Sequence, residues 1–333
     1  MQKQKKILII GGYGQVGTNI ARLIREADST IVLILGGRNP QNGESLVKEL
    51  KHAETVYVNL SENFNLAQFQ RVDLIISALD DHSNILRETA ISNGIACITI
   101  SELADRVSTT AFLGLHQTIS APIVFAGHWQ AGLLTLVIKQ LASGFSKITT
   151  VASAGLYDEK DPVGPLVAEE VIGFVGKALI REDGNWLYVN SKDNTRLIKL
   201  HDGSLAVGHP MSALDVPSIA AFTDARNIRF DFIVGDSIGS SKGLIASHDL
   251  YIEMEGISLS GEEKILRTIV CGLKGNSHLT AVGVYLIAER ILGLNGQAAQ
   301  KSGGLYLPET IVSSDHIIKR LAEFGIETIE EKV

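Results

Sequence analysis

Short apolar runs, rich in isoleucine, leucine and valine, recur through the first 125 residues of the chain. Most of them do not alternate with polar residues, which is typical of parallel strands whose two faces are both covered. The stretches between them have helical spacing, and the first places Val16, Ile20 and Ile24 on one face. Repeated strand–helix–strand units of this length predict a right-handed, doubly wound parallel sheet of the Rossmann type. We expect its strands at residues 6–10, 31–35, 56–58, 72–76, 96–100 and 122–125.

The pattern changes near residue 127. Residues 129–142 have helical spacing but are apolar almost all round, which is typical of a helix enclosed in a core. Residues 228–234 alternate between apolar and polar side chains, as expected for an antiparallel strand with one covered face. Further helices are expected at residues 278–292 and 314–324. The second part is therefore predicted to be an α+β domain, with its other strands at residues 148–154, 186–190, 195–200, 250–257 and 265–270.

Composition narrows the class of protein. The 333 residues are 45% hydrophobic and 20% charged, with a mean hydropathy of +0.18, which suits two domains that each bury a core. The net charge is −7, whereas proteins that bind the phosphate backbone of nucleic acids usually carry a basic surplus. No apolar run is long enough for a membrane helix, and the two cysteines, Cys97 and Cys271, favour a reducing compartment. We therefore expect a cytoplasmic protein whose partner is neither a nucleic acid nor a membrane.

Glycines gather directly after the first expected strand, in the order Gly12-x-Gly14-x-x-Gly17. A GxGxxG sequence alone is weak evidence, but here it opens an amphipathic helix, the context in which it binds dinucleotides. Gly12 allows a tight turn, Gly14 lets a pyrophosphate approach the backbone, and Gly17 lets helix and strand pack closely. We expect a dinucleotide at this loop, the alternative being a purely structural turn. The other loop members are Tyr13, Gln15 and Val16.

The end of the second expected strand bears on which dinucleotide binds. Enzymes that use NAD usually place a carboxylate there, about 20 residues after the glycines, to accept the ribose 2′-OH. This chain has Gly36-Gly37-Arg38-Asn39 instead, and the planar guanidinium of Arg38 suits a 2′-phosphate. We therefore expect NADP(H), with NAD(H) as the alternative and a solvent-exposed loop arginine as the plainer interpretation of Arg38.

Three residues after later strands are further cofactor candidates. Asn59 follows the third expected strand, where it would border the adenine. Ala78 and Leu79 follow the fourth and are small or apolar enough to lie beside the central phosphates and riboses. Ordinary loop packing explains Ala78 and Leu79 equally well.

Several stretches, taken in order, resemble the saccharopine dehydrogenase-like family of NAD(P)-dependent oxidoreductases. They are ILIIGGYGQVG (7–17), GGR (36–38), DLIISAL (73–79), AISNGIACITI (90–100), AGHWQAGLLTLV (126–137) and GGLYLPE (303–309). The resemblance covers the first 140 residues best. One departure is residues 127–132, which lack the proline of the Gly-x-x-Pro-Gly turn that the family often has before its long helix.

The resemblance implies a domain plan and an activity. Residues 1–127 would form the Rossmann domain, to which a closing segment of about 308–333 returns. Residues 128–307 would form an α+β substrate and dimerisation domain, so a homodimer is expected. Characterised members of the family oxidise or reduce a C–N bond in amino acids and opine-like conjugates, which implies a small-molecule substrate of that kind here.

Candidate catalytic residues follow from strand order. Loops after the fifth and sixth expected strands lie at the carboxyl edge of the sheet, where ligands of such folds bind. They carry Ser101, Glu102 and His128. His128 is a candidate acid/base or substrate-orienting group, and a helix cap is the equally good alternative. Glu102 fits an early helix position, of the N3 type, better than a catalytic role. The nine histidines have no ligand spacing, so we expect no metal.

Together these observations favour an NADP(H)-dependent oxidoreductase that acts on a C–N bond of an amino-acid-like or opine-like substrate. Two alternatives remain open. One is a redox sensor or regulatory protein that binds NADP(H) without turnover. The other is an enoyl-type reductase of the same architecture.

Overall fold

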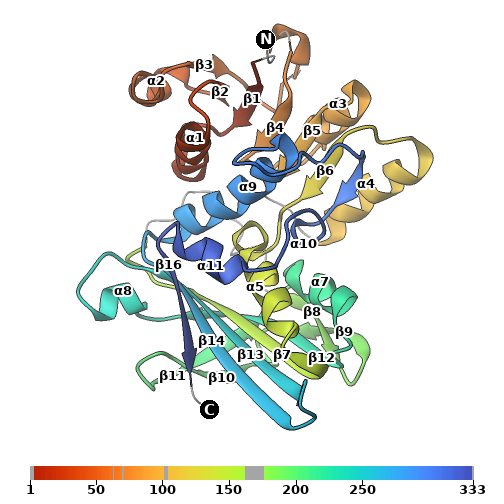
Figure 1. Cartoon of the computed structure of the whole chain (residues 1–333), viewed down its shortest axis with the longest axis vertical. Coiled ribbons are helices and arrows are strands. Elements are labelled where there is room, and N and C mark those ends of the chain that lie inside the picture. Colours follow the sequence, from red (N-terminus) through yellow and green to blue (C-terminus); the bar gives the residue numbers. More distant parts are fainter. Residues whose placement is uncertain (1–3, 63, 70, 101–103, 162–175, 332–333) are drawn as a thin grey trace. The chain divides into compact units, whose positions relative to one another are not determined.

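The computed structural model describes residues 4–62, 64–69, 71–100, 104–161 and 176–331. The chain divides into two compact units (Figure 1). The first unit contains residues 1–127 and 280–312, and the second contains residues 128–279 and 313–333. Among the described residues, no helix is both long enough and apolar enough to cross a membrane.

The first unit is a seven-stranded sheet in the order β15-β6-β5-β4-β1-β2-β3, and every pair in it is parallel. This confirms the predicted Rossmann-like sheet and all six of its expected strands. Those strands are β1 (Lys6–Ile10), β2 (Val32–Gly37), β3 (Ala53–Tyr57), β4 (Leu74–Ser77), β5 (Ala96–Thr99) and β6 (Pro122–Phe125). The unpredicted seventh strand is β15 (Gly304–Tyr306), which pairs with β6.

Helices follow the strands, as the doubly wound pattern requires. They are α1 (Gln15–Ala27), α2 (Glu44–Leu50), α3 (Ile85–Asn93), α4 (Ala104–His116) and α10 (Pro308–Ile311), with the last part of α9 (Asn276–Leu292). One core cluster joins Leu8, Ile10 and Ile75 of the strands to Leu86 and Ala90 of α3. The intervening strand residues Ile7 and Ile9 are also fully buried, so both faces of the sheet are covered, as the non-alternating runs indicate.

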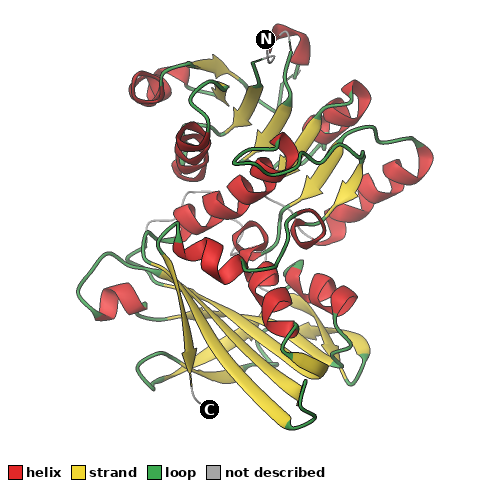
Figure 2. Ribbon diagram, in the orientation of Figure 1, coloured by secondary structure: helices red, strands yellow, loops and turns green. Residues whose placement is uncertain are grey.

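The second unit contains a nine-stranded mixed sheet, with helices α5, α7 and α11 gathered on one of its faces (Figure 2). The helices are α5 (Leu133–Ala142), α7 (Asp215–Phe222), α8 (Ile238–Ser241) and α11 (Ile317–Ala322). The main strand order is β10-β11-β12-β7-β13-β14-β16, and β8 pairs with β12 and with β9. The strands are β7 (Phe145–Tyr157), β8 (Lys177–Glu182), β9 (Asn185–Asn190), β10 (Arg196–Lys199), β11 (Leu205–Pro210), β12 (Asn227–Val234), β13 (His248–Ser258), β14 (Glu263–Gly272) and β16 (Ile326–Glu331). The predicted α+β character of this part is confirmed.

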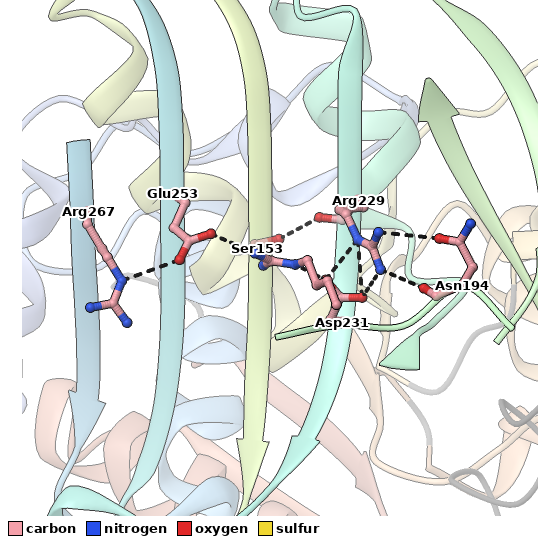
Figure 3. Close-up of polar contacts among 7 residues, drawn as sticks. Ser153, Asn194, Arg229, Asp231, Glu253 and Arg267 are labelled. Atoms are coloured by element: carbon pink, nitrogen blue, oxygen red, sulfur yellow. Dashed lines mark hydrogen bonds and ion pairs between the residues drawn. The ribbon is translucent and has the colours of Figure 1, made fainter. Parts of the chain in front are cut away.

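A row of charged side chains crosses this second sheet (Figure 3). Arg196 donates to Asp231 and to Glu253, in each case at 2.6 Å, and so joins strands that are not neighbours. The strand between them, β7, offers only Ala152 opposite Glu253 and Ala154 opposite Asp231. Because alanine leaves room above the sheet, the long Arg196 side chain can bridge β12 and β13 there.

Two expectations about the second unit need correction. Residues 129–142 do not form one helix, because a short turn at Trp129–Gly132 precedes α5. The closing segment also differs from the plan that placed 308–333 with the Rossmann domain. Residues 280–312 lie in the first unit, whereas residues 313–333 lie in the second, where β16 extends the sheet by antiparallel pairing with β14. The backbone hydrogen bonds between β14 and β16 therefore hold the end of the chain in the second unit.

Candidate functional site

The glycine loop joins β1 to α1, and its three glycines have two different steric roles. A Cβ on Gly12 would lie 2.7 Å from the carbonyl oxygen of Ile9, and one on Gly17 would lie 2.1 Å from that of Gly11. Both positions therefore require glycine for close backbone packing. Gly14 is different, because a Cβ there would meet only the Gly11 oxygen, at 3.2 Å, and the residue is exposed. Gly14 thus leaves bare backbone open to solvent directly before α1.

This bare backbone lies at a helix end with free donors. The amides of the first helical turn have no partner within the helix, and the aligned peptide dipoles make that end positive. α1 starts at Gln15 and has no acidic residue in its first turn that would compete for an anion. The arrangement suits the pyrophosphate of a dinucleotide, which places negative charge on such amides.

The end of β2 lies beside this loop, since β1 and β2 are hydrogen-bonded neighbours. Gly36 and Gly37 are buried, whereas Arg38 and Asn39 are exposed. Among the described residues, no hydrogen bond or ion pair engages the Arg38 guanidinium. An exposed arginine with its donors unused at this edge can receive a phosphate group.

Tyr13, inside the glycine loop, turns its ring toward the end of β2. Its hydroxyl accepts a hydrogen bond of 2.9 Å from the backbone N–H of Asn39. A Cβ on Gly37 would lie 2.3 Å from the Tyr13 hydroxyl oxygen, and one on Gly43 would lie 2.9 Å from the Cδ1 atom of the ring. Tyr13 therefore occupies a slot between two glycines and links the loop to the segment that carries Arg38.

The other cofactor candidates lie at the same edge of the sheet, because they follow β3 and β4, which run parallel in it. Leu79 packs on the loop, since a Cβ on Gly11 would come within 3.0 Å of the Leu79 Cγ. The backbone N–H of Ala78 donates to the carbonyl of Ile10 at 2.9 Å. Asn59 is partly exposed and donates to Glu62 at 2.9 Å, within its own loop.

Of the three catalytic candidates, Ser101 and Glu102 lie outside the described residues. His128 begins the second unit and is buried, with its Nε2 atom 2.7 Å from the hydroxyl of Ser218 on α7. His128 is the N-cap residue of the short turn at Trp129–Gly132, but its side chain makes no cap hydrogen bond, and α5 begins five residues further on, at Leu133. The structure therefore places His128 where the helix-cap alternative expects it, but without the side-chain hydrogen bond of a cap.

The turn after His128 has an unusual backbone. Gln130, Ala131 and Gly132 have φ values of 54°, 51° and 93°, so three successive residues are left-handed. This conformation costs a non-glycine residue roughly 1–2 kcal/mol. Asp215 of α7 offsets part of that cost, because its carboxylate accepts from the Trp129 N–H at 2.7 Å and from the Thr135 hydroxyl at 2.6 Å. The residues that in the resembling family form a proline–glycine turn thus form a strained turn held by a buried carboxylate.

A second histidine, His248, supports the same turn. The indole N–H of Trp129 donates to its Nε2 atom at 3.1 Å, and the side-chain nitrogen of Gln130 lies 2.9 Å from the same atom. Since an indole N–H can only donate, Nε2 must accept and the ring is neutral, with its proton on Nδ1. Burial lowers the pKa of His248 to about 4, which agrees with a neutral ring.

The sequence pattern alone did not point to Arg87 and Asp81, which lie near the carboxyl ends of β4 and β5. Arg87 is buried on α3, donates to the Thr99 hydroxyl at 3.2 Å and to the Asn84 side chain at 2.6 Å. The buried Asp81 carboxylate accepts from the backbone N–H of Leu86 at 2.8 Å and so caps α3. The available signal was an arginine on an otherwise apolar helix face.

Residues 1–103, less than a third of the 333, match the family model for shikimate/quinate 5-dehydrogenase. No curated protein matches the chain. The family match covers the strands and helices that build the glycine loop, Arg38 and Leu79.

Solved structures share the fold of both units. The apo saccharopine dehydrogenase (L-Glu forming) of Saccharomyces cerevisiae has a TM-score of 0.71 at 13% identity, covering 99% of this chain and 100% of that one. The apo scyllo-inositol dehydrogenase of Lactobacillus casei has a TM-score of 0.51 at 14% identity, covering 99% of each chain. The expected resemblance to saccharopine dehydrogenase is confirmed for the fold, and the family match supports an oxidoreductase with a nicotinamide cofactor.

Proposed function

We propose that the chain is an NADP(H)-dependent oxidoreductase that acts on a C–N bond of an amino-acid-like or opine-like substrate. The observation that carries the proposal is the glycine loop, where Gly14 leaves bare backbone at the amino end of α1. An anionic diphosphate is the ligand such an end favours. The match of residues 1–103 to a dehydrogenase family model supports the same interpretation.

The choice of NADP(H) over NAD(H) rests on Arg38. The exposed segment at the end of β2 carries its guanidinium and no carboxylate, so a ribose 2′-OH lacks the carboxylate acceptor that NAD enzymes usually place there. A 2′-phosphate would instead meet a planar cation with its donors unused by any described residue. We place Ala78, Leu79 and Asn59 around the rest of the nucleotide.

The C–N substrate follows from the fold shared with the yeast saccharopine dehydrogenase, and stands as a proposal. The nicotinamide supplies the hydride chemistry when bound, so the chain's residues must orient the substrate and move a proton at its nitrogen. We assign that proton to His128, which Ser218 holds at 2.7 Å, with Ser101 and Glu102 as substrate contacts. Imidazole is a common proton acceptor in enzymes, and in this role it would take the proton that the amine loses as the C–N bond is oxidised.

We also propose a homodimer formed through the second unit. The hairpin of β10 and β11 exposes Leu197 and Val207, which face each other across the strands, and Leu205 beside them. Their exposed fractions are 63%, 48% and 63%. A patch of this kind on one side of a hairpin supports association with another copy. Light scattering of wild type and of Leu197→Asp tests this, and an unchanged dimer in the variant excludes this hairpin.

The experiment for the activity has two stages. Isothermal titration with NADPH and NADH measures binding, and absorbance at 340 nm then follows turnover with a panel of amino acids paired with keto acids. We expect tighter binding of NADPH and turnover with at least one pair. Tight binding without turnover on that panel or with unsaturated acyl substrates would favour a redox sensor, whereas turnover with the acyl substrates alone would favour an enoyl-type reductase.

A further inference from the structure

We propose that Tyr13 is a positioning residue for cofactor selection: it fixes the segment that carries Arg38, so that discrimination of the 2′-phosphate depends on the glycine loop. This inference rests on the proposed use of NADP(H). It gives the tyrosine between Gly12 and Gly14 a role other than contact with the pyrophosphate, because its ring is directed to β2.

The first support is the slot that holds the ring. Gly37 and Gly43 lie on either side of the Arg38 loop, and a methyl group at either position would collide with Tyr13. Both glycines are buried and Tyr13 is half-buried, so the ring packs against backbone on the side that faces them. A rigid aromatic side chain in a matched slot fixes the distance between two loops at little cost in side-chain entropy.

The second support is the set of backbone hydrogen bonds around Arg38. The Gly36 carbonyl accepts from the Gly11 N–H at 2.8 Å, and the Gly37 carbonyl accepts from the Val58 N–H at 3.0 Å. On the other side of Arg38, the Asn39 N–H donates to Tyr13 at 2.9 Å. Among the described hydrogen bonds, the one from Asn39 to Tyr13 is thus the bond by which a side chain holds the backbone directly after Arg38.

The consequence concerns preorganisation. A guanidinium binds phosphate best through two parallel hydrogen bonds, which demand a fixed backbone below it. If the backbone on one side of Arg38 were free, binding would have to order it, and affinity would fall. NADH has no 2′-phosphate, so loss of this order should weaken NADPH binding and leave NADH binding nearly unchanged.

The test measures dissociation constants for NADPH and NADH by isothermal titration. Tyr13→Phe keeps the ring and removes the hydroxyl, and should weaken NADPH binding by about three- to tenfold, the usual range for one hydrogen bond. Tyr13→Ala removes both and should weaken it by roughly ten- to thirtyfold, with NADH changed by less than about threefold. Tyr188→Phe, on an exposed tyrosine of the second unit, is the control and should change neither constant.

A double-mutant cycle separates the positioning role from general damage. Gly37→Ala should displace the ring and weaken NADPH binding about as much as Tyr13→Ala does, because its methyl collides with the Tyr13 hydroxyl. In the double variant the methyl meets no ring, so the loss should be no greater than in Tyr13→Ala alone. Additive losses would mean that the methyl blocks the nucleotide directly, and would overturn the inference.

Arg38→Ala keeps this inference apart from the proposed function. If Arg38→Ala leaves the ratio of the two constants unchanged, the proposal of NADP(H) fails and the role of Tyr13 fails with it. If Arg38→Ala changes the ratio while Tyr13→Phe and Tyr13→Ala do not, the role of Tyr13 alone is overturned. Parallel losses for both nucleotides in the Tyr13 variants would also overturn it, because they would indicate a collapsed loop.

Discussion

The backbone N–H of Trp129 donates a 2.7 Å hydrogen bond to the carboxylate of Asp215, which has no exposed surface. The two residues are 86 positions apart, and their bond fixes the entry to the left-handed turn that follows His128. Because the same carboxylate accepts from Thr135, it holds both the turn and the start of α5. The backbone position of His128 in the second unit thus depends on an aspartate from a distant part of the sequence.

Asp215→Ala should therefore destabilise the protein strongly. The change leaves the Trp129 N–H and the Thr135 hydroxyl buried without this acceptor, which costs about 3 kcal/mol in the free energy of unfolding. Urea denaturation followed by far-UV circular dichroism measures the loss. Asp202→Ala, on an exposed turn of the same unit, is the matched control and should leave the denaturation midpoint where it is. Equal midpoints for both variants would contradict the role assigned to Asp215.

Substitutions at Gly17 and at Gly14 should have different effects, the first on stability and the second on nucleotide binding. Gly17→Ala places a Cβ 2.1 Å from the Gly11 oxygen, so it should cost about 2 kcal/mol in the free energy of unfolding. Gly14→Val adds a side chain where the backbone is exposed, so it should abolish binding of NADPH and NADH at a cost in unfolding free energy of about 1 kcal/mol or less. Thermal unfolding and titration of both variants check this, and retained binding in Gly14→Val would make the loop merely structural.

Arg38→Asp should reverse the cofactor preference. It removes a phosphate-binding cation and supplies a carboxylate that repels the 2′-phosphate and can accept a ribose hydroxyl. We expect NADPH binding to weaken by about ten- to a hundredfold, while NADH binding holds or improves. Arg22→Asp, which breaks the 2.7 Å ion pair to Glu49 elsewhere in the first unit, has the same charge change and serves as the control. A similar loss for both nucleotides in Arg38→Asp would refute the phosphate-binding role.

Stability should depend on pH through His248. Its pKa is lowered by burial to about 4 in the folded chain, against about 6.5 in the unfolded one, so the unfolded chain binds more protons between these values. The stabilisation is complete above pH 6.5 and is lost as the pH falls toward 4, with a slope of at most about 1.4 kcal/mol per pH unit.

Urea denaturation between pH 7 and pH 5 tests this dependence. His248→Gln should flatten the decline in that window, whatever its effect on stability at pH 7. His278, whose pKa burial also lowers to about 4, has the same sign and contributes a slope of its own, so His278→Gln is the comparison. An undiminished slope in the His248 variant would show that the ring is not neutral in the fold.

Sequence periodicity predicted the first unit well, and the reason is physical. Strands buried on both faces need uninterrupted apolar runs, and β1 and β2 show them as KILII and VLIL. β15 has only the three residues Gly304–Tyr306, and its place in the sheet comes from pairing with β6 and from the packing of Leu305 on the core. A stretch of three residues is too short for its hydrophobic pattern to predict a strand.

The turn at residues 130–132 escaped prediction for a different reason. The apolar run from Trp129 to Ala142 has helical spacing throughout, and local preference alone favours one helix. The left-handed turn exists because Asp215 and His248, each far away in sequence, bind Trp129. Similarly, the Ser218 partner of His128 lies 90 residues away. These contacts form only in the folded chain, so the hydrophobic pattern along the sequence cannot predict them.

The most direct test of the account is a crystal structure of the protein grown with NADPH. The account predicts the pyrophosphate on the backbone amides that follow Gly14, and the 2′-phosphate within hydrogen-bond distance of the Arg38 guanidinium. A nucleotide bound away from the Gly12–Gly17 loop, or one whose 2′-phosphate points away from Arg38, would contradict it.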